Sequence, residues 1–226
     1  MTPESDGSYV THPYPVKSNM SIAANLRMAF KEETYLTDLG KKAVLRVATP
    51  AILVPREEYN PNLNPNPDEN LNETLYSTVI TGHKGEVKVA TEIEELDVVA
   101  IFPVNSDLQM VVQDHFPIVS TQNVMTDVWR DTYNKYYNGA DHRKLFAYFH
   151  DKVVDIFCFE QHRIRFANSF QATHAHDALY YTLYTWKQLG MNSSDDTLYV
   201  MGDMPHGDWL LERYRAYITK VEKIEK

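Results

Sequence analysis

The sequence predicts an α/β fold with mixed sheets flanked by helices, and three observations lead to this class. Short runs rich in β-forming residues alternate with amphipathic segments of helical period along the chain. The carboxyl-terminal part carries three consecutive strand-like runs joined by tight connections, which is typical of an antiparallel meander. Hydrophobic residues make up 43% and charged residues 23% of the 226 residues, a balance that allows a sizeable buried core.

The amino-terminal part begins with an extended segment followed by a helix. Residues 9–16 alternate as a strand does, but Pro13 and Pro15 restrict this segment to an edge strand or an extended arm. Ser18 or Ser21 can cap the helix. The apolar face of this helix comprises Ile22, Leu26, Ala29 and Phe30.

The middle of the chain is predicted to hold short strands, three helices and one polar insertion. The insertion, NPNLNPNPDENLN at residues 60–72, has little to bury, so we expect it to be the most mobile internal segment. Asn105 or Ser106 caps one helix, and Asn138-Gly139 ends another that carries Trp129. A short helix is expected at 73–79, and strands at 43–48, 51–54, 86–90, 97–104 and 118–120.

The carboxyl-terminal part has the most regular pattern. Strands are predicted at 144–150, 153–160 and 164–171, with the first of them between its hairpin partner and a strand at 197–202. Thr173 can cap a helix that ends at Gly190 and presents Leu179, Leu183 and Trp186 on one face. A final helix is predicted at 208–221, with Leu210, Tyr214, Tyr217 and Ile218 facing inward.

Three meander strands followed by helix, strand and helix form the order of a ribonuclease-H-like fold, which is also the order of each half of an actin-like protein. We therefore predict a duplicated, actin-like fold with two mixed sheets. Residues 1–141 would form an incomplete amino-terminal half and residues 142–226 a complete carboxyl-terminal half. This topology alone implies no function.

Several segments resemble one family. They are FANSFQATHAHDALYYTLYTWKQLG and DDTLYVMGDMP in the carboxyl-terminal part, with SNMSIAANLRMAF, ATPAILVP and DVVAIFPV upstream. Together they resemble the uncharacterised bacterial proteins catalogued as domain of unknown function 3822, over nearly the whole chain. The resemblance implies an actin-like ATPase fold of unknown function. Family members open with a strand hairpin that is missing here, so we expect the natural protein to begin upstream of Met1.

Composition limits the partners and the compartment. The net charge of −9 repels phosphate backbones, and no basic cluster offsets it, so nucleic acid and anionic membranes are not expected as partners. Cys158 is the only cysteine and lies between two phenylalanines, which predicts a buried thiol in a reducing compartment. The sequence shows neither a signal peptide at its start nor an apolar run of about 18 residues. We expect a cytoplasmic protein.

The residues that would hold a nucleotide in an actin-like fold are incomplete. Such proteins cradle phosphates between two hairpin turns with an acidic residue near glycine. The first turn is not in this sequence, and the second would be Asp151-Lys152, without glycine. Only Gly202, followed by Asp203, stands where a pair of glycines would contact adenosine. We interpret Asp151 and Lys152 as an ordinary hairpin turn and expect no ATP binding.

Other catalytic or metal sites have little support. Asp155 has no acidic partner for the two-metal chemistry of a nuclease, and Ser169 has no histidine or acid at the spacing of a nucleophilic triad. His174 and His176 are the candidate metal ligands, but they point in different directions at a helix start and have no evident third ligand. We therefore predict no catalytic residues and no resident metal.

Two functions remain open. The preferred hypothesis is a non-catalytic binding or scaffolding protein with an unknown protein partner and no cofactor. The alternative is a nucleotide-dependent ATPase or phosphotransferase that uses ATP with magnesium between the two halves, through Asp151, Lys152, Gly202 and Asp203. The aromatic stripe of Tyr180, Tyr181, Tyr184 and Trp186 is interpreted as the wide buried face of a helix, or else as a partner-binding surface.

Overall fold

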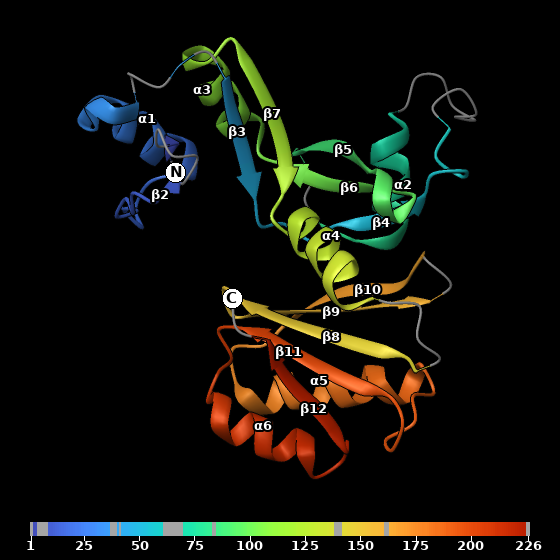
Figure 1. Ribbon diagram of the computed structural model, residues 1–226. Helices are drawn as coiled ribbons and strands as arrows, with labels where there is room; N and C mark the ends of the chain where they lie inside the picture. Colours follow the sequence, from blue (N-terminus) through green and yellow to red (C-terminus); the bar gives the residue numbers. More distant parts are fainter. Residues whose placement is uncertain are drawn as a thin grey trace. The chain divides into compact units, whose positions relative to one another are not determined.

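The computed structural model of the chain describes residues 2–3, 9–36, 40, 42–60, 70–82, 85–137, 142–160 and 163–224. The chain divides into two compact units. The first consists of Met1–Thr49, Asn66–Thr91 and Phe102–Val124, and the second of Pro50–Pro65, Glu92–Ile101 and Met125–Lys226. The predicted division at residues 141 and 142 separates two halves of a duplication and stays a prediction. Figure 1 shows the elements in sequence colours.

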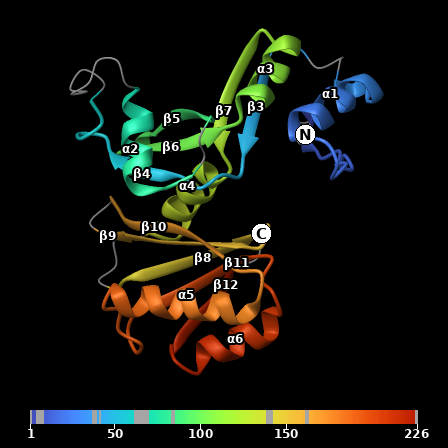
Figure 2. The same ribbon diagram turned by 180° about the vertical axis from the view of Figure 1, so that it is seen from behind.

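A five-stranded mixed sheet forms the centre of the second unit, in the order β10-β9-β8-β11-β12 (Figure 1 and Figure 2). Its strands are β8 (Lys144–His150), β9 (Val153–Glu160), β10 (Arg163–Gln171), β11 (Thr197–Gly202) and β12 (Lys220–Ile224). The first three form the predicted antiparallel meander, whereas β11 is parallel to both β8 and β12. The prediction that residues 144–150 lie between the hairpin partner and β11 is confirmed.

Two helices, α5 (Ala175–Gln188) and α6 (Gly207–Arg215), cover one face of this sheet (Figure 1). Alternate strand residues such as Leu145, Ile156 and Leu198 face them in the main hydrophobic core. The hydroxyl of the buried Tyr214 on α6 lies 2.9 Å from Thr182 Oγ1 and donates to the Ala178 carbonyl of α5 at 3.2 Å. The two helices are therefore joined by polar as well as apolar contacts.

The other face of the sheet is aromatic. Phe146 stacks on Phe157 and on Tyr199, with ring centroids 5.3 and 5.1 Å apart. Helix α4 (Met125–Tyr136) adds Tyr133 and Tyr136, which contact Phe159 and Tyr199 respectively. Because successive strand residues point to opposite faces, β8 and β9 separate a mostly aliphatic layer under α5 and α6, which includes Phe149, from an aromatic layer under α4.

Two predictions for the carboxyl-terminal part are wrong. The final helix ends at Arg215 rather than Val221, and the chain continues as β12, which pairs with the edge of β11. Ile218 is buried while Tyr217 is 62% exposed, so the apolar residues after Tyr214 do not continue one helical face. His174 rather than Thr173 occupies the N-cap of α5, and it makes no side-chain capping bond.

The first unit contains a parallel pair of strands, β3 (Lys42–Val47) and β7 (Ile118–Asn123). Helices α1 (Ile22–Glu32) and α3 (Ser106–His115) pack on one face of the pair. The cluster comprises Ala23, Phe30, Val111, Val112 and Phe116, with Ala43, Leu45 and Val119 packed against it. The side chains of Ser21 and Asn105 accept bonds from backbone N–H groups at the helix starts, so both predicted caps are confirmed.

The amino-terminal strand is shorter than predicted. Only Tyr9–Val10 is extended as β2, and it pairs antiparallel with β1 (Thr2–Pro3). Residues 11–17 have no regular structure. Pro13 and Pro15 lack the backbone N–H that a ladder requires, which explains why the strand stops before them.

The segment between β3 and α3 holds a three-stranded sheet in the order β4-β6-β5. Its elements are β4 (Ile52–Pro55), α2 (Leu71–Val79), β5 (Val87–Ile93) and β6 (Val98–Val104), and a short 3₁₀ turn at Glu94–Leu96 joins β5 to β6. A second 3₁₀ turn at Thr34–Leu36 lies before β3. Asn70 caps α2, so the end of the predicted mobile insertion belongs to a helix. Residues 61–69 of that insertion, and Asn138-Gly139, lie outside the described residues. None of the described helices has the length and apolar character needed to cross a membrane.

Candidate functional site

The four residues considered for nucleotide binding meet at the carboxyl-terminal ends of two neighbouring strands of the five-stranded sheet, β8 and β11. Asp151 and Lys152 follow β8, whereas Gly202 and Asp203 stand at the end of β11. Because β8 and β11 are parallel neighbours with Gly202 opposite Phe149, Asp151-Lys152 and Gly202-Asp203 lie at the same end of these strands. The carboxyl-terminal end of β8 and β11 is therefore the candidate functional site.

Asp151 and Lys152 form the predicted two-residue hairpin turn between β8 and β9. Their φ angles of 45° and 64° lie in the left-handed region, as a tight turn compatible with strand twist requires. The Lys152 carbonyl accepts a 2.7 Å bond from the backbone N–H of Ala172. The turn is thus held to the end of β10 by its own backbone.

Three polar side chains form a closed cluster next to this turn, one from each meander strand. His150 Nε2 lies 2.5 Å from Asp155 Oδ2, and the Ser169 hydroxyl donates to Asp155 Oδ1. Asp155 is only 5% exposed. The hydrogen bond to Asp155 is the main cause of the raised pKa of His150, and burial opposes it. Both carboxylate oxygens are therefore engaged inside the protein.

This cluster lacks the arrangement of a nucleophilic triad. In a triad the serine hydroxyl bonds to histidine, which takes its proton, and the acid orients the histidine from the other side. Here Asp155 stands between Ser169 and His150, so the serine hydroxyl is bound to a carboxylate. The cluster was not predicted from the sequence, because its three residues lie on three different strands. The two-residue turn fixes the register of β8 against β9 and places Tyr148 opposite Asp155. This register was the sequence signal that could have shown that His150, two residues after Tyr148, lies near Asp155.

Gly202 permits a close approach between β11 and β8. A Cβ atom at Gly202 would lie 2.1 Å from the Phe149 carbonyl oxygen, and its φ of 88° disfavours other residues. The backbone N–H of Asp203 donates to the same oxygen at 3.0 Å. Gly202, the single glycine where a nucleotide-binding relative would have a pair, therefore has a structural role in the sheet.

A pocket of about 470 Å³ lies between the starts of α5 and α6. Its lining comprises Thr173, His174, Ala175, His176, Pro205, His206 and Trp209. The His176 ring packs against Trp209, with centroids 4.7 Å apart. The predicted metal candidates His174 and His176 thus share a pocket with His206, a third imidazole that sequence spacing did not reveal.

These histidines do not form a metal centre in this geometry. Among the residues that the structure describes, no three histidine, cysteine, aspartate or glutamate side chains are placed to hold one ion. A structural zinc site requires four ligands and a catalytic site three. The pocket instead combines aromatic surface with imidazole donors, a lining suited to small polar molecules.

The aromatic stripe of α5 is divided between the core and the surface. Trp186 is buried, and Tyr181 stacks on Phe170 with ring centroids 4.6 Å apart. Tyr180 and Tyr184 are 61% and 49% exposed and stack on each other at 5.8 Å. The interpretation of the whole stripe as a buried face is therefore wrong for these two tyrosines.

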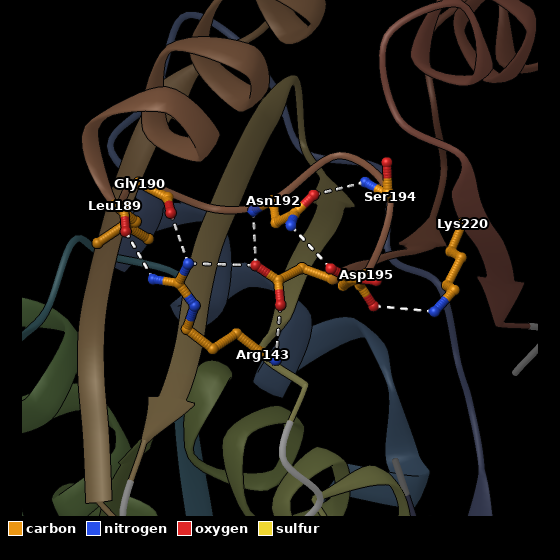
Figure 3. A network of polar contacts seen from close by, with 8 residues as sticks. Arg143, Leu189, Gly190, Asn192, Ser194, Asp195 and Lys220 are labelled. Atoms are coloured by element: carbon orange, nitrogen blue, oxygen red, sulfur yellow. Dashed lines mark hydrogen bonds and ion pairs between the residues drawn. The ribbon is translucent and has the colours of Figure 1, made fainter.

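A polar network lies at the other end of the same two strands, where β8 and β11 begin (Figure 3). The guanidinium of Arg143 donates to the carbonyl groups of Leu189 and Gly190 at the end of α5 and pairs with Asp196 at 3.2 Å. The Asp196 carboxylate accepts from the backbone N–H groups of Arg143 and Asn192 at 2.9 and 2.7 Å. Because these bonds connect the end of α5 and the start of β11 to the start of β8, we regard the network as structural.

Comparison with known proteins identifies the family and the fold. Residues 1–221 match the family described as "Protein of unknown function (DUF3822)". A crystal structure from Bacteroides thetaiotaomicron VPI-5482, of a protein with actin-like ATPase fold and unknown function, is 24% identical with a TM-score of 0.82. The alignment covers 92% of this chain and 78% of that one. This agreement confirms the predicted fold class.

A second similar structure comes from a PilM-PilN type IV pilus biogenesis complex. It is 9% identical with a TM-score of 0.54, and the alignment covers 96% of this chain and 80% of that one. No curated protein matches the sequence. The chain belongs to the DUF3822 family and has the actin-like ATPase fold.

Proposed function

We propose that this chain is a non-catalytic binding protein that holds a protein partner on the outer face of α5. The observation that carries the proposal is the exposed, stacked pair of Tyr180 and Tyr184. Tyrosine supplies a large, rigid contact area with a polar tip and loses little conformational entropy on binding. Two such rings side by side form a preorganised surface.

The residues at the carboxyl-terminal end of β8 and β11, where an actin-like ATPase would hold phosphates, support a non-catalytic role. Asp155 has both carboxylate oxygens engaged by His150 and Ser169, and Gly202 is used for packing against Phe149. The turn residues Asp151 and Lys152 carry Cβ atoms where a phosphate-binding turn would expose bare backbone. The similar structure described as a PilM-PilN type IV pilus biogenesis complex belongs to a protein complex, which is consistent with such a role.

Site-specific photo-crosslinking tests the binding surface. A photoreactive amino acid replaces Tyr184 in one variant and Glu212, an exposed residue of α6, in a matched control. We expect one discrete adduct in cells from the Tyr184 position and none from Glu212, and a Tyr180→Ser change should abolish it. Equal crosslinking from both positions would show that α5 has no special role.

Calorimetric titration with magnesium–ATP tests the alternative function. We expect only dilution heats at physiological nucleotide concentrations, because Asp155 is bound to His150 and Ser169 and the turn Asp151-Lys152 contains no glycine. Millimolar or tighter binding that is lost on Asp151→Ala would instead support a nucleotide-dependent ATPase or phosphotransferase.

A further inference from the structure

Four exposed side chains form a stripe along the outer face of α5. They are His176, Tyr180, Tyr184 and Lys187. At about 100° per residue these four positions fall within an arc of about 80° around the helix axis. The stripe is about 16 Å long, from a helical rise of about 1.5 Å per residue over residues 176–187. It therefore extends the stacked tyrosine pair by one polar residue at each end.

The first end of this stripe opens into the pocket between the starts of α5 and α6. His176 belongs to both, because it lines the pocket and lies one helical turn before Tyr180. His174 and His206 line the same pocket, and each occupies the N-cap position of its helix without making a side-chain capping bond. The pocket therefore offers three imidazoles as hydrogen-bond donors, and no acidic residue is among those that line it.

Positive charge stands near both ends of the stripe. At the pocket end, Arg213 Cζ lies 5.5 Å from the centroid of the Trp209 ring, which lines the pocket and packs against His176. At the other end, the ammonium group of Lys187 is exposed, and it forms no ion pair with an acidic residue in the part of the chain that the structure describes. Both ends can therefore attract a carboxylate.

Acidic groups limit where the carboxylates of a partner can lie. Asp177, the one acidic residue of α5, is half-buried and lies about 60° around the helix from Tyr180, so it borders the middle of the stripe. Asp208, in the first turn of α6, does not line the pocket. Because charges more than about 8 Å away are screened at physiological ionic strength, these local groups outweigh the net charge of −9. Carboxylates are therefore favoured at the ends of the stripe and apolar residues in its middle.

We propose that the protein partner bound on α5 presents an acidic segment to it. One carboxylate side chain of this segment enters the pocket and accepts hydrogen bonds from the imidazoles. Apolar residues cover Tyr180 and Tyr184, and a second carboxylate pairs with Lys187. At about 3.3 Å per residue, the two acidic residues of an extended segment stand about five positions apart. The inference rests on the proposed function and adds the chemistry of the partner.

Photo-crosslinking in cells tests the inference, with p-benzoylphenylalanine in place of Tyr184 and mass spectrometry of the adduct. We expect the crosslinked segment of the partner to carry Asp or Glu on both sides of the attachment point, about five residues apart. Lys187→Glu should lower the adduct yield about threefold to tenfold, and exchange of the facing acidic residue of the partner for lysine should restore it. Lys223→Glu, the same charge change at an exposed position of β12, is the matched control and should leave the yield unchanged.

A second variant, His206→Gly, tests the pocket. The φ of His206 is 49°, a conformation that glycine adopts without strain, so the change removes one imidazole and keeps the start of α6. The yield of the adduct should fall about threefold to tenfold, because a carboxylate in the pocket loses one hydrogen-bond donor. The melting temperature should not fall, which separates this effect from unfolding.

Failure of this inference differs from failure of the proposed function. Absence of any discrete adduct from position 184 would refute the proposed function and the inference with it. A discrete adduct whose crosslinked segment contains no acidic residue would keep the binding surface on α5 and overturn the acidic segment. Equal yields from Lys187→Glu and Lys223→Glu, or an unchanged yield in His206→Gly, would overturn it as well.

Discussion

Replacement of Gly202 by alanine tests whether close packing of β11 against β8 explains this glycine. The added Cβ would lie 2.1 Å from the Phe149 carbonyl oxygen, where real Cβ contacts do not occur. That oxygen belongs to the backbone of a central strand and accepts the 3.0 Å bond from Asp203 N–H. Because the contacted atom is a backbone oxygen and not the end of a flexible side chain, either the two strands must separate or the backbone must change conformation.

The expected cost follows from three contributions. A left-handed conformation costs an L-residue about 1–2 kcal/mol. Loss of the Asp203 hydrogen bond adds about 0.5–1.5 kcal/mol, and the overpacking adds about 1–3 kcal/mol. We therefore expect Gly202→Ala to lower the free energy of unfolding by about 2.5–6.5 kcal/mol, out of a total of about 5–15 kcal/mol.

Gly190 provides a matched control in the same unit. Its φ is 61°, but no atom lies within 4 Å of the position that its Cβ would occupy. Gly190→Ala should therefore cost only about 1 kcal/mol, because the conformational cost is partly offset by reduced freedom in the unfolded chain. At about 2–4 °C per kcal/mol, the melting temperature followed by circular dichroism should fall by about 5–26 °C for Gly202→Ala and by about 2–4 °C for Gly190→Ala. Equal losses in the two variants would refute the packing argument.

The remaining predictions concern titration, burial and the polar network. The pKa of His150 is raised in the folded state. Its contribution to the free energy of unfolding is therefore fully present below the unfolded pKa of about 6.5 and is lost as pH rises through the folded pKa. Urea unfolding should therefore show stability falling above about pH 6.5, and Asp155→Asn should flatten this dependence. Burial raises the pKa of Cys158 to about 12, so a thiol reagent should modify it only on unfolding, and labelling of the native chain would contradict this. Asp196→Ala leaves two backbone N–H groups without their acceptor and should lower the free energy of unfolding, measured by chemical denaturation, by about 2–4 kcal/mol. Asp195→Ala removes one exposed hydrogen bond and should lower it by less than about 1 kcal/mol. Similar losses in the two variants would argue against a structural role of the network.

The sequence alone determined most of the second unit. The bounds of β8 and β9 agree with the predicted strands residue for residue, because the two-residue turn Asp151-Lys152 and the alternating apolar residues define a hairpin locally. The start of α1 was readable for the same reason, since Ser21 supplies the cap within three residues of the group it binds. Such features depend on neighbours in the chain.

Only the tertiary structure decided the features that depend on distant neighbours. Residues 220–224 form a strand because β11 offers an open edge, and nothing in their own sequence required it. Register across β8, β9 and β10 brought His150, Asp155 and Ser169 together, and helix packing left Tyr180 and Tyr184 outside the core. In each case a backbone edge, a register or a buried area is shared between segments far apart in the sequence. Local propensity and spacing carry no record of that pairing, so these features emerged only with the folded chain.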